Sequence, residues 1–366
     1  MERILITVAA ITAIAGLLAF LLSLANRTIA DYGEKKLTIN QDKELTVEGG
    51  SSLLSALMTQ DIFIPSACGG KGSCGYCKVK VLSGGGQVLP TEAGYITPAE
   101  ASEGLRLACQ CKVKEDMALQ IPEELFNVKQ YEYTVSRIDP VTEKIRHVFL
   151  DLPPGKEISF KPGQFIQIQT PPYGDIEEEV YRAYSIASSP SSTDRIELFI
   201  GYVPEGICTT YIHQHLKTGD RLTLAGPFGD FHYHETDREM VMACIGTGLA
   251  PIMSILRHMR ENNIQRKATL FFSARTRKDL YLVEELEAIQ RDLPNFRLVC
   301  SLTRPTAECG WNGDTGRVPE LLEKYIENAA EAEAYLCGNN DMIDSVVAAL
   351  KSKGMPEEQI FYDKFM

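Results

Sequence analysis

The cysteines are the residues of this chain best suited to chemistry. Ten occur among 366 residues, and five of them fall between positions 68 and 111. Disulfide scaffolds are usually short secreted chains, whereas this chain is long and its cysteines are clustered. Metal ligation therefore explains the clustering better. Cys68, Cys74 and Cys77 are separated by five and then two residues, and Cys109 follows after 31 more. This spacing offers four thiolates to one metal centre.

Zinc and iron-sulfur clusters both accept four thiolates. Zinc ribbons usually pair two Cys-x2-Cys knuckles, whereas here only Cys74 and Cys77 form one, and Cys111 follows Cys109 at the wrong spacing. The intervening sequence GGKGS carries three glycines, which let the backbone fold around a cluster and present amide donors to its sulfides. We therefore expect a plant-type 2Fe-2S cluster. Cys111 is interpreted as a buried thiol that shares a strand face with Cys109.

A strand-like segment with Arg182, Ala183, Tyr184 and Ser185 carries side chains that suit a flavin. Alternation along a strand sends Arg182 and Tyr184 to one side and Ser185 to the other. A guanidinium can bind a diphosphate, an aromatic ring can stack on isoalloxazine, and a hydroxyl can hydrogen-bond the flavin N5. An exposed Arg beside a core Tyr is the simpler explanation of these residues taken alone.

A second motif strengthens the flavin interpretation. Gly206, Ile207, Cys208 and Thr209 precede the helical segment YIHQHLK and can direct free backbone amides at the same diphosphate. Without the first motif, N-capping by Thr209 or Thr210 would explain the second. Together the two motifs predict bound FAD.

Two segments of the C-terminal third suit a nicotinamide dinucleotide. The first contains Gly246, Thr247, Gly248 and Pro251. It lies between a strand and a helix, where glycines permit close approach of a diphosphate, although it is not a GxGxxG fingerprint. Cys337 and Gly338 end a later apolar strand, where ligands of open α/β sheets collect. We expect NADH as the substrate, with Cys337 near the nicotinamide, while a buried structural Cys is the alternative.

Hydrophobic periodicity predicts a multidomain chain that positions these residues. Residues 35–49 alternate as a β-hairpin, and a helix capped by Ser51 or Ser52 follows; with three more strands they form a small α+β unit. Six short strands divided by Pro and Gly then predict an antiparallel β-barrel. From Met240, strands alternate with helices, as in a parallel α/β sheet. The expected domains are a transmembrane anchor over 1–27, a ferredoxin domain over 33–126, an FAD-binding barrel over 129–233 and an NADH-binding domain over 236–366.

The N-terminal segment predicts a membrane anchor. From Ile4 to Ala25 run 22 residues without a charge, long enough as a helix to cross a bilayer. A cleavable signal peptide is the alternative, but the apolar run exceeds the usual length. Basic residues are more frequent after the segment than before it, so the positive-inside rule predicts a single-pass protein of the cell inner membrane with its soluble domains on the cytoplasmic side.

The net charge of the chain argues against one class of partner. The formal net charge is -12, whereas contact with nucleic acid needs Lys and Arg to displace counterions from phosphates. We therefore expect no nucleic-acid partner.

The motifs RAYS, GICTT, GPFG, GTGLAP and LCGNN resemble, in this order, the ferredoxin-NADP reductase superfamily from about residue 130 onward. With a membrane helix and a β-grasp ferredoxin domain ahead of them, the whole chain resembles the F subunits of sodium-translocating NADH:quinone reductases. One departure is that the stretch from Gln164 to Arg182 is shorter than in that family. The resemblance implies electron flow from NADH to FAD to 2Fe-2S and on to integral-membrane redox subunits, towards quinone.

The resemblance also implies residue roles. Ser185 and Cys337 would position the hydride, and the C-terminal Phe365 would shield the flavin. Arg275 and Tyr281 would bind the adenosine portion of NADH. Two alternatives stay open: the NADH-dependent reductase component of an oxygenase, and a non-enzymatic membrane-bound ferredoxin.

Overall fold

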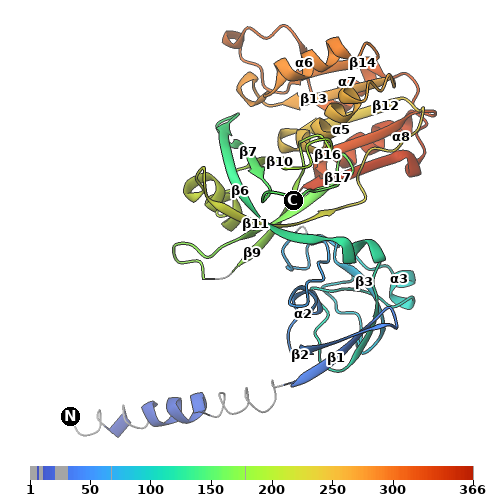
Figure 1. Ribbon diagram of the computed structural model, residues 1–366. Coiled ribbons are helices and arrows are strands. Elements are labelled where there is room, and N and C mark those ends of the chain that lie inside the picture. Colours follow the sequence, from blue (N-terminus) through green and yellow to red (C-terminus); the bar gives the residue numbers. More distant parts are fainter. Residues whose placement is uncertain (1–5, 8–10, 21–31, 67, 178, 366) are drawn as a thin grey trace. The chain divides into compact units, whose positions relative to one another are not determined.

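The computed structural model describes residues 6–7, 11–20, 32–66, 68–177 and 179–365 (Figure 1). The chain divides into two compact units, an N-terminal unit of residues 1–128 and a C-terminal unit of residues 129–366. Each unit has its own hydrophobic core.

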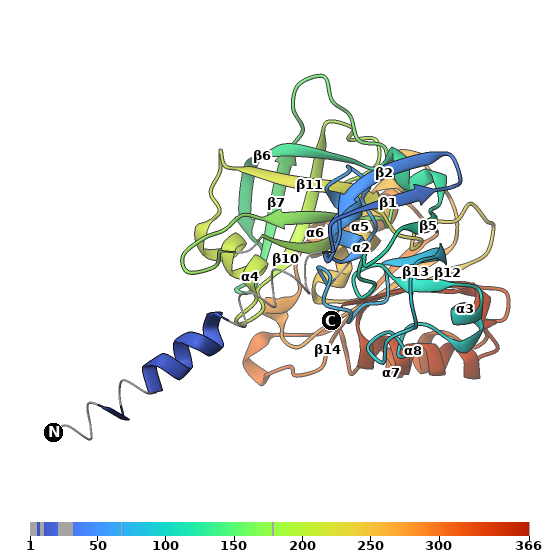
Figure 2. The same cartoon turned by 90° about the horizontal axis from the view of Figure 1, so that it is seen from below.

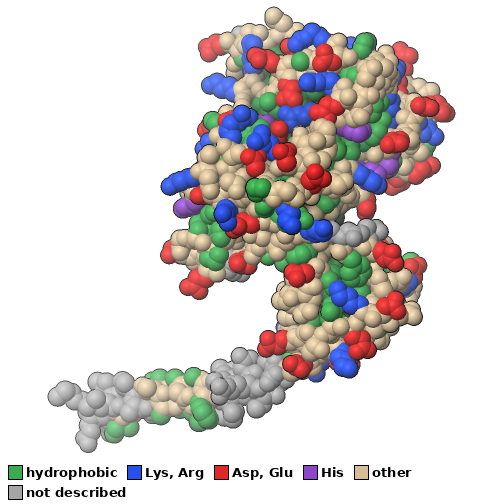
Figure 3. Space-filling view, in the orientation of Figure 1, with side chains coloured by type: hydrophobic (Ala, Val, Ile, Leu, Met, Phe, Trp, Pro, Cys, Tyr) green, Lys and Arg blue, Asp and Glu red, His purple; other side chains and the backbone are tan. Residues whose placement is uncertain are grey.

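Most of the predicted membrane anchor lies outside the described residues. Residues 11–20 are helical and expose apolar side chains, which Figure 3 shows along this segment. These are Ile11, Ile14, Leu17, Leu18 and Phe20. Within the described part of the chain, no helix combines the length and the apolar character that a membrane crossing requires.

The N-terminal unit is built on a five-stranded sheet with the order β2-β1-β5-β3-β4. Its strands are β1 Glu34–Ile39, β2 Lys43–Glu48, β3 Lys78–Ser83, β4 Leu105–Leu107 and β5 Met117–Gln120. The predicted hairpin is confirmed, because β1 and β2 pair in antiparallel register. The predicted helix is confirmed as α2 (Leu53–Met58), where the Ser52 hydroxyl accepts from the Ser55 amide.

Two short helical elements of this unit have no counterpart in the prediction. Helix α3 (Pro98–Ser102) begins at a capping box in which Thr97 and Glu100 bond each other's backbone amides. The 3-10 helix η1 (Glu123–Asn127) ends the unit. Both are too short to show a hydrophobic period, so sequence patterning could not reveal them.

The prediction that Cys109 and Cys111 share a strand face is wrong. Strand β4 ends at Leu107, and the amide of Cys111 then donates to the Leu107 carbonyl at 3.0 Å in a tight turn. Strand alternation therefore does not apply to these two cysteines. The Cys111 thiol is buried and lies 3.6 Å from the Gly85 carbonyl.

The C-terminal unit begins with the predicted antiparallel barrel. Its strands are β6 Lys129–Pro140, β7 Ile145–Asp151, β8 Phe165–Thr170, β9 Val180–Ser185, β10 Arg195–Gly201 and β11 Arg221–Phe228. Their order is β10-β7-β6-β11-β8-β9, and Figure 2 shows β11, β6 and β7 in this part of the unit. An antiparallel bridge between Ile186 and Leu198 brings the two ends of the sheet together. A short helix, α4 (Ile207–Thr210), runs into a single π-helical turn, η2 (Tyr211–His215).

A six-stranded parallel sheet follows, as predicted, with the order β15-β14-β13-β12-β16-β17. Its strands are β12 Met240–Ile245, β13 Ala268–Ala274, β14 Phe296–Leu302, β15 Asp314–Thr315, β16 Glu333–Asn339 and β17 Ile360–Phe365. Its longer helices are α5 Leu249–Glu261, α6 Val283–Asp292, α7 Val318–Tyr325 and α8 Asn340–Ser352. Helices α5 and α6 share one core with one face of the sheet, and α7 and α8 share another with the opposite face.

The surface of the C-terminal unit is mixed in charge. On the face drawn in Figure 3, acidic and basic side chains are interspersed rather than gathered by sign.

Candidate redox sites

The four predicted cluster ligands lie in the N-terminal unit as two thiol pairs. Cys74 donates to the Cys68 sulfur at 3.3 Å, and this bond lowers the pKa of Cys68 to about 4. Cys77 likewise bonds Cys109 and lowers the pKa of Cys109 to about 7. The same bonds raise the pKa of the donors Cys74 and Cys77, so in each pair one thiol is readily ionised, as a thiolate ligand must be, and the other keeps the shared proton. Among the residues described, no group of three or more His, Cys, Asp or Glu side chains is gathered closely enough to hold a metal ion.

The loop between the ligands depends on its glycines. Gly70, Gly72 and Gly75 adopt φ of +86°, +72° and +74°, where L side chains are strained. A Cβ at Gly72 would lie 2.6 Å from the side-chain nitrogen of Gln110, and one at Gly75 would lie 2.7 Å from the Tyr95 ring. Four thiols and a loop that only glycine permits fit a cluster of iron and sulfide.

A buried ion pair, which sequence reasoning missed, supports the strand that leads to Cys109. Arg106 and Glu92 are 2.7 Å apart, with side chains only 6% and 0% exposed. Glu92 also accepts from the Leu107 amide at 2.9 Å, and Arg106 donates to the Gly86 carbonyl at 3.2 Å. Burial alone would raise the pKa of Glu92, but the hydrogen bonds, led by that from Arg106, hold it below its usual value. No spacing rule in the sequence signals this pair.

The two predicted flavin motifs meet in the C-terminal unit. The Tyr184 hydroxyl on β9 donates to the Cys208 sulfur on α4 at 3.2 Å, and burial raises the pKa of Tyr184 well above its usual value. Ser185 is buried, and Arg182 and Ala183 are partly exposed. The structure therefore places the stacking candidate beside the diphosphate candidate, although the motifs are distant in sequence.

The loop before α4 is closed by its own threonine. Gly206 is the N-cap residue, and no side chain caps the helix, so capping by Thr209 does not occur. Instead the Thr209 hydroxyl donates to the Val203 carbonyl at 3.1 Å and accepts from the Val203 amide at 3.2 Å. A Cβ at Gly206 would lie 2.7 Å from that hydroxyl. The glycine is therefore required by close packing, and Ile207 and Cys208 follow it in the first turn.

The predicted nicotinamide loop, residues 246–251, joins β12 to α5. Gly246 has φ +51°, and a Cβ there would meet nothing within 4 Å, so this side of the loop is open for a ligand. Gly248 faces inward, where a Cβ would lie 2.2 Å from the Cys337 carbonyl oxygen. Pro251 is buried in the first turn of α5. The loop is thus open at its first glycine and tightly packed at its second.

Cys337 lies on β16 at the end predicted for ligands, but its side chain has no exposed surface. Burial raises the pKa of its thiol well above the usual value. Asp363 on β17 stands opposite Cys337 in the parallel register and is also buried. Sequence reasoning did not identify Asp363 as a neighbour of Cys337. The only hint in the segment IFYDKFM is that it contains a single carboxylate. Phe365, the last described residue, is partly exposed at the end of β17.

The two residues expected at the adenosine portion lie in different environments. Arg275 is exposed directly after β13. Tyr281 is only 3% exposed, and its hydroxyl donates to the Gly246 carbonyl at 3.0 Å.

Gly338, the other predicted residue at the end of β16, is required by packing. A Cβ at Gly338 would lie 2.6 Å from the Met342 side chain.

Comparison with known proteins matches each part of this arrangement. The 2Fe-2S iron-sulfur cluster binding domain family matches residues 37–114, the oxidoreductase FAD-binding domain family matches residues 132–233, and the oxidoreductase NAD-binding domain family matches residues 242–348. The F subunit of the Na(+)-translocating NADH-quinone reductase of Neisseria meningitidis is 36% identical over 99% of both chains. The corresponding F subunit of Idiomarina loihiensis is 36% identical over the full length of both.

The chain belongs to the family of Na(+)-translocating NADH-quinone reductase F subunits. The resemblance drawn from the order of the motifs is thereby confirmed, and so are the expected FAD, NADH and 2Fe-2S cluster. Among solved structures, an Amycolatopsis cytochrome P450 reductase aligns with a TM-score of 0.74 and 26% identity over 90% of this chain and 98% of that one. A ferredoxin reductase in carbazole 1,9a-dioxygenase aligns with a TM-score of 0.70 and 27% identity, over 91% and 98%.

Proposed function

We propose that this chain is the NADH-oxidising subunit of a membrane-bound NADH:quinone reductase. Electrons pass from NADH to FAD and then to the 2Fe-2S cluster. The observation that carries the proposal is the presence of all three binding modules in one chain that aligns along its whole length with the quinone reductase relatives.

The residues of the chain bind and orient the redox groups. FAD, when bound, accepts an electron pair as hydride and gives electrons up singly, which the cluster requires. Arg182 and the loop from Gly206 to Thr209 would hold the flavin diphosphate, while Tyr184 and Ser185 would face the ring system. Burial of Ser185 and Cys337 excludes water from the proposed hydride path.

The nicotinamide side of the site would use a separate set of groups. The open face of Gly246 would admit the NADH diphosphate, with Thr247, Gly248 and Pro251 shaping the loop. Exposed Arg275 would meet the adenosine portion, and Phe365 would shield the flavin. Cys68, Cys74, Cys77 and Cys109 would hold the iron as thiolates.

The membrane attachment belongs to the same proposal. Residues 4–25 would form a single transmembrane anchor within a domain of residues 1–27, with residues 33–126, 129–233 and 236–366 as ferredoxin, FAD and NADH domains in the cytoplasm. The uncharged run of 22 residues supports the anchor. Neighbouring membrane subunits would accept the electrons, towards quinone, with sodium transport as in the named relatives.

The test uses the full chain purified in detergent and supplied with FAD, iron and sulfide. We expect one flavin and one 2Fe-2S cluster per chain. Anaerobic NADH should bleach the flavin and then reduce the cluster, as followed by absorbance and electron paramagnetic resonance. Zinc in place of iron, or flavin that NADH does not bleach, would contradict the proposal and leave a non-enzymatic ferredoxin.

An oxygenase reductase is the second candidate, because the two solved reductases named above align with 90% and 91% of this chain. A pull-down from detergent extract separates the candidates. Co-purification of integral-membrane redox subunits supports the quinone reductase, whereas co-purification of an oxygenase supports the alternative.

A further inference from the structure

Strand β10 of the barrel faces two different cores. Ile196, Leu198 and Ile200 are fully buried in the barrel core. Phe199, between them, belongs instead to the core that α5 and α6 form with the parallel sheet. Because side chains alternate along a strand, Glu197, Phe199 and Gly201 lie on one face. This odd-numbered face of β10 lies against the nicotinamide-binding half of the C-terminal unit.

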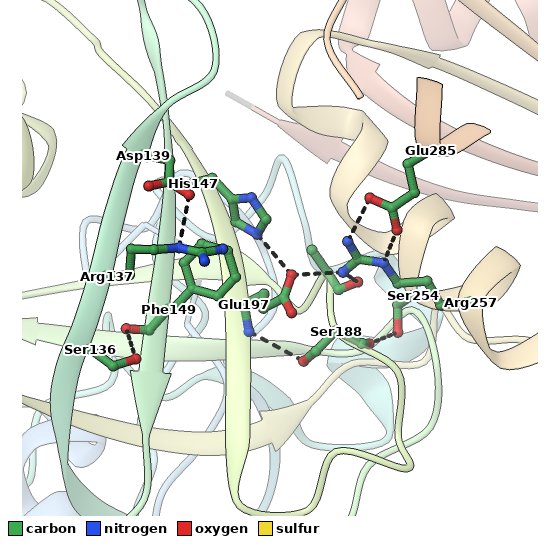
Figure 4. Close-up of polar contacts among 11 residues, drawn as sticks. Ser136, Arg137, Asp139, His147, Phe149, Ser188, Glu197, Ser254, Arg257 and Glu285 are labelled. Atoms are coloured by element: carbon green, nitrogen blue, oxygen red, sulfur yellow. Dashed lines mark hydrogen bonds and ion pairs between the residues drawn. The ribbon is translucent and has the colours of Figure 1, made fainter. Parts of the chain in front are cut away.

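The first contact of this face is ionic. Arg257 of α5 donates to the Glu197 carboxylate at 2.8 Å, as Figure 4 shows. It also donates to the Ala187 carbonyl at 3.0 Å. Glu285 of α6 holds the other side of the guanidinium with bonds of 2.7 and 3.0 Å. His147 Nε2 lies 2.8 Å from the same Glu197 carboxylate. The arginine therefore ties helix α5 to the barrel in one orientation.

The second contact is aromatic and reaches the nicotinamide loop. The Phe199 ring packs edge-on against the Tyr281 ring, with centroids 5.3 Å apart at 90°. Tyr281 in turn bonds the Gly246 carbonyl. Phe199 thus supports the residue that holds the first glycine of the loop.

The third contact is direct. A Cβ built on Gly201 would lie 3.2 Å from the Thr247 methyl carbon, which is tighter than an ordinary van der Waals contact. The strand and the loop therefore approach so closely that a methyl group added to the strand would push against the loop.

The same strand is also tied to the segment that leaves the flavin strand. Ile186 forms a bridge with Leu198, and the Ala187 amide donates to the Glu197 carbonyl at 2.8 Å. The Ser188 hydroxyl accepts from the Glu197 amide at 3.2 Å, and Ser254 of α5 donates to the Ser188 carbonyl at 2.8 Å. Figure 4 shows these serines beside the ion pair. Strand β10 is therefore bonded to the segment that directly follows the flavin motif and is packed against the nicotinamide loop.

We infer that the odd-numbered face of β10 is a positioning element for hydride transfer. Glu197, Phe199 and Gly201 set the distance between the loop at residues 246–248 and the flavin motif at residues 182–185. None of the three needs to touch a cofactor. This inference rests on the proposed function, since it concerns the geometry of the proposed donor and acceptor.

The experiment changes the spacing by one methyl group and then restores it. In the full chain with FAD, Gly201→Ala should lower the single-turnover rate of flavin bleaching at saturating NADH about 10-fold, because small misplacements of reacting groups are costly. Thr247→Ser in the same background removes the methyl group that the new Cβ meets and keeps the hydroxyl, so the double variant should bleach at the rate of the Thr247→Ser single variant. Arg260→Gln, on an exposed part of α5, is the matched control and should bleach at the wild-type rate.

Hydrogen exchange without NADH gives a readout that does not depend on turnover. Amides of residues 246–250 should exchange faster in Gly201→Ala than in the wild type and return to wild-type behaviour in the double variant. A Gly201→Ala protein with wild-type bleaching and exchange, or a loss that Thr247→Ser does not repair, overturns the inference. If NADH does not bleach the flavin of the wild-type protein, the proposed function is overturned instead. The exchange rates would then still test whether Gly201 packs against the loop.

Discussion

The chain contains two glycine loops for which we propose different chemistry, and they are held in different ways. The proposed cluster loop contains three of the proposed ligands within residues 68–77, and its glycines are required by their own φ angles and by nearby side chains such as Gln110 and Tyr95. The nicotinamide loop is held by the backbone of β16 at Gly248 and by the Tyr281 phenol at Gly246. The first site is mostly local, whereas the second exists only when distant elements are in register.

The buried charges of the two units differ in the same way. Glu92 and Arg106 support the cluster region from within the N-terminal unit and are almost fully buried. Glu197 and Arg257 join the barrel to the helix that follows the nicotinamide loop, and their side chains are 19% and 14% exposed. Loss of the first pair should therefore affect the fold of one unit, and loss of the second should affect the alignment of two sites within the other.

The largest expected effect is on the cluster ligands. Cys77→Ser should greatly weaken or abolish the cluster absorbance, because a serine hydroxyl ionises much less readily than a thiol and is a poorer ligand for iron, while NADH still bleaches the flavin at the wild-type rate. Cys111→Ala is the control, since its thiol contacts the Gly85 carbonyl and should not be a ligand. A cluster that persists unchanged in Cys77→Ser, or disappears in Cys111→Ala, would contradict the ligand assignment. The contrast between the local cluster site and the nicotinamide site, which depends on distant elements, would then be lost.

The next effect is on the stability of the N-terminal unit. Glu92→Gln leaves the Arg106 charge buried and unpaired, which should lower the free energy of unfolding by about 3–5 kcal/mol. Urea unfolding followed by cluster absorbance measures this loss. Glu44→Gln, which removes the partner of Lys36 in a pair that is two-thirds exposed, should change it by less than about 1 kcal/mol. Equal losses in the two variants would disprove the buried pair's role.

Gly248→Ala should act on the other unit only. The added Cβ would lie 2.2 Å from the Cys337 carbonyl oxygen, so the loop must move away from β16. We expect flavin reduction by NADH to slow about 100-fold, with the cluster spectrum unchanged. Stopped-flow absorbance measures the rate. Gly94→Ala, whose Cβ meets nothing within 4 Å, is the neutral comparison; a similar slowing there would show that the effect is not specific to the loop.

The smallest effect is a pH dependence of the C-terminal unit. Burial would raise the pKa of Glu197, but His147 and Arg257 outweigh it and hold this pKa at about 2. Because that is below the value of about 4.3 in an unfolded chain, the stabilisation is present above about pH 4.3 and is lost as pH falls towards 2. Glu197→Gln should lower the free energy of unfolding by about 2 kcal/mol at pH 6, with the difference from wild type shrinking in acid. A difference that does not vary with pH would refute this assignment.

Much of the fold was predictable because it depends on local periodicity. Alternation predicted the hairpin of β1 and β2 and the six barrel strands, and strands alternating with helices predicted the parallel sheet. The Ser52 cap was also predictable, since a hydroxyl before an apolar helical run commonly accepts a first-turn amide. The strand assignment of Cys109 and Cys111 failed because the chain leaves β4 in a tight turn, which a pattern of apolar residues does not distinguish from a strand.

The sequence by itself determined the chemistry available to this protein: four thiols at cluster spacing, an Arg-Ala-Tyr-Ser strand and a glycine loop before a helix. Only the tertiary structure decided how those groups are aligned. The ion pair of Glu92 with Arg106, the position of Asp363 opposite Cys337, and the contact of Phe199 with Tyr281 each join residues that are far apart in the chain. Such pairs carry no local signal, because the burial and register that create them arise when sheets and helices pack.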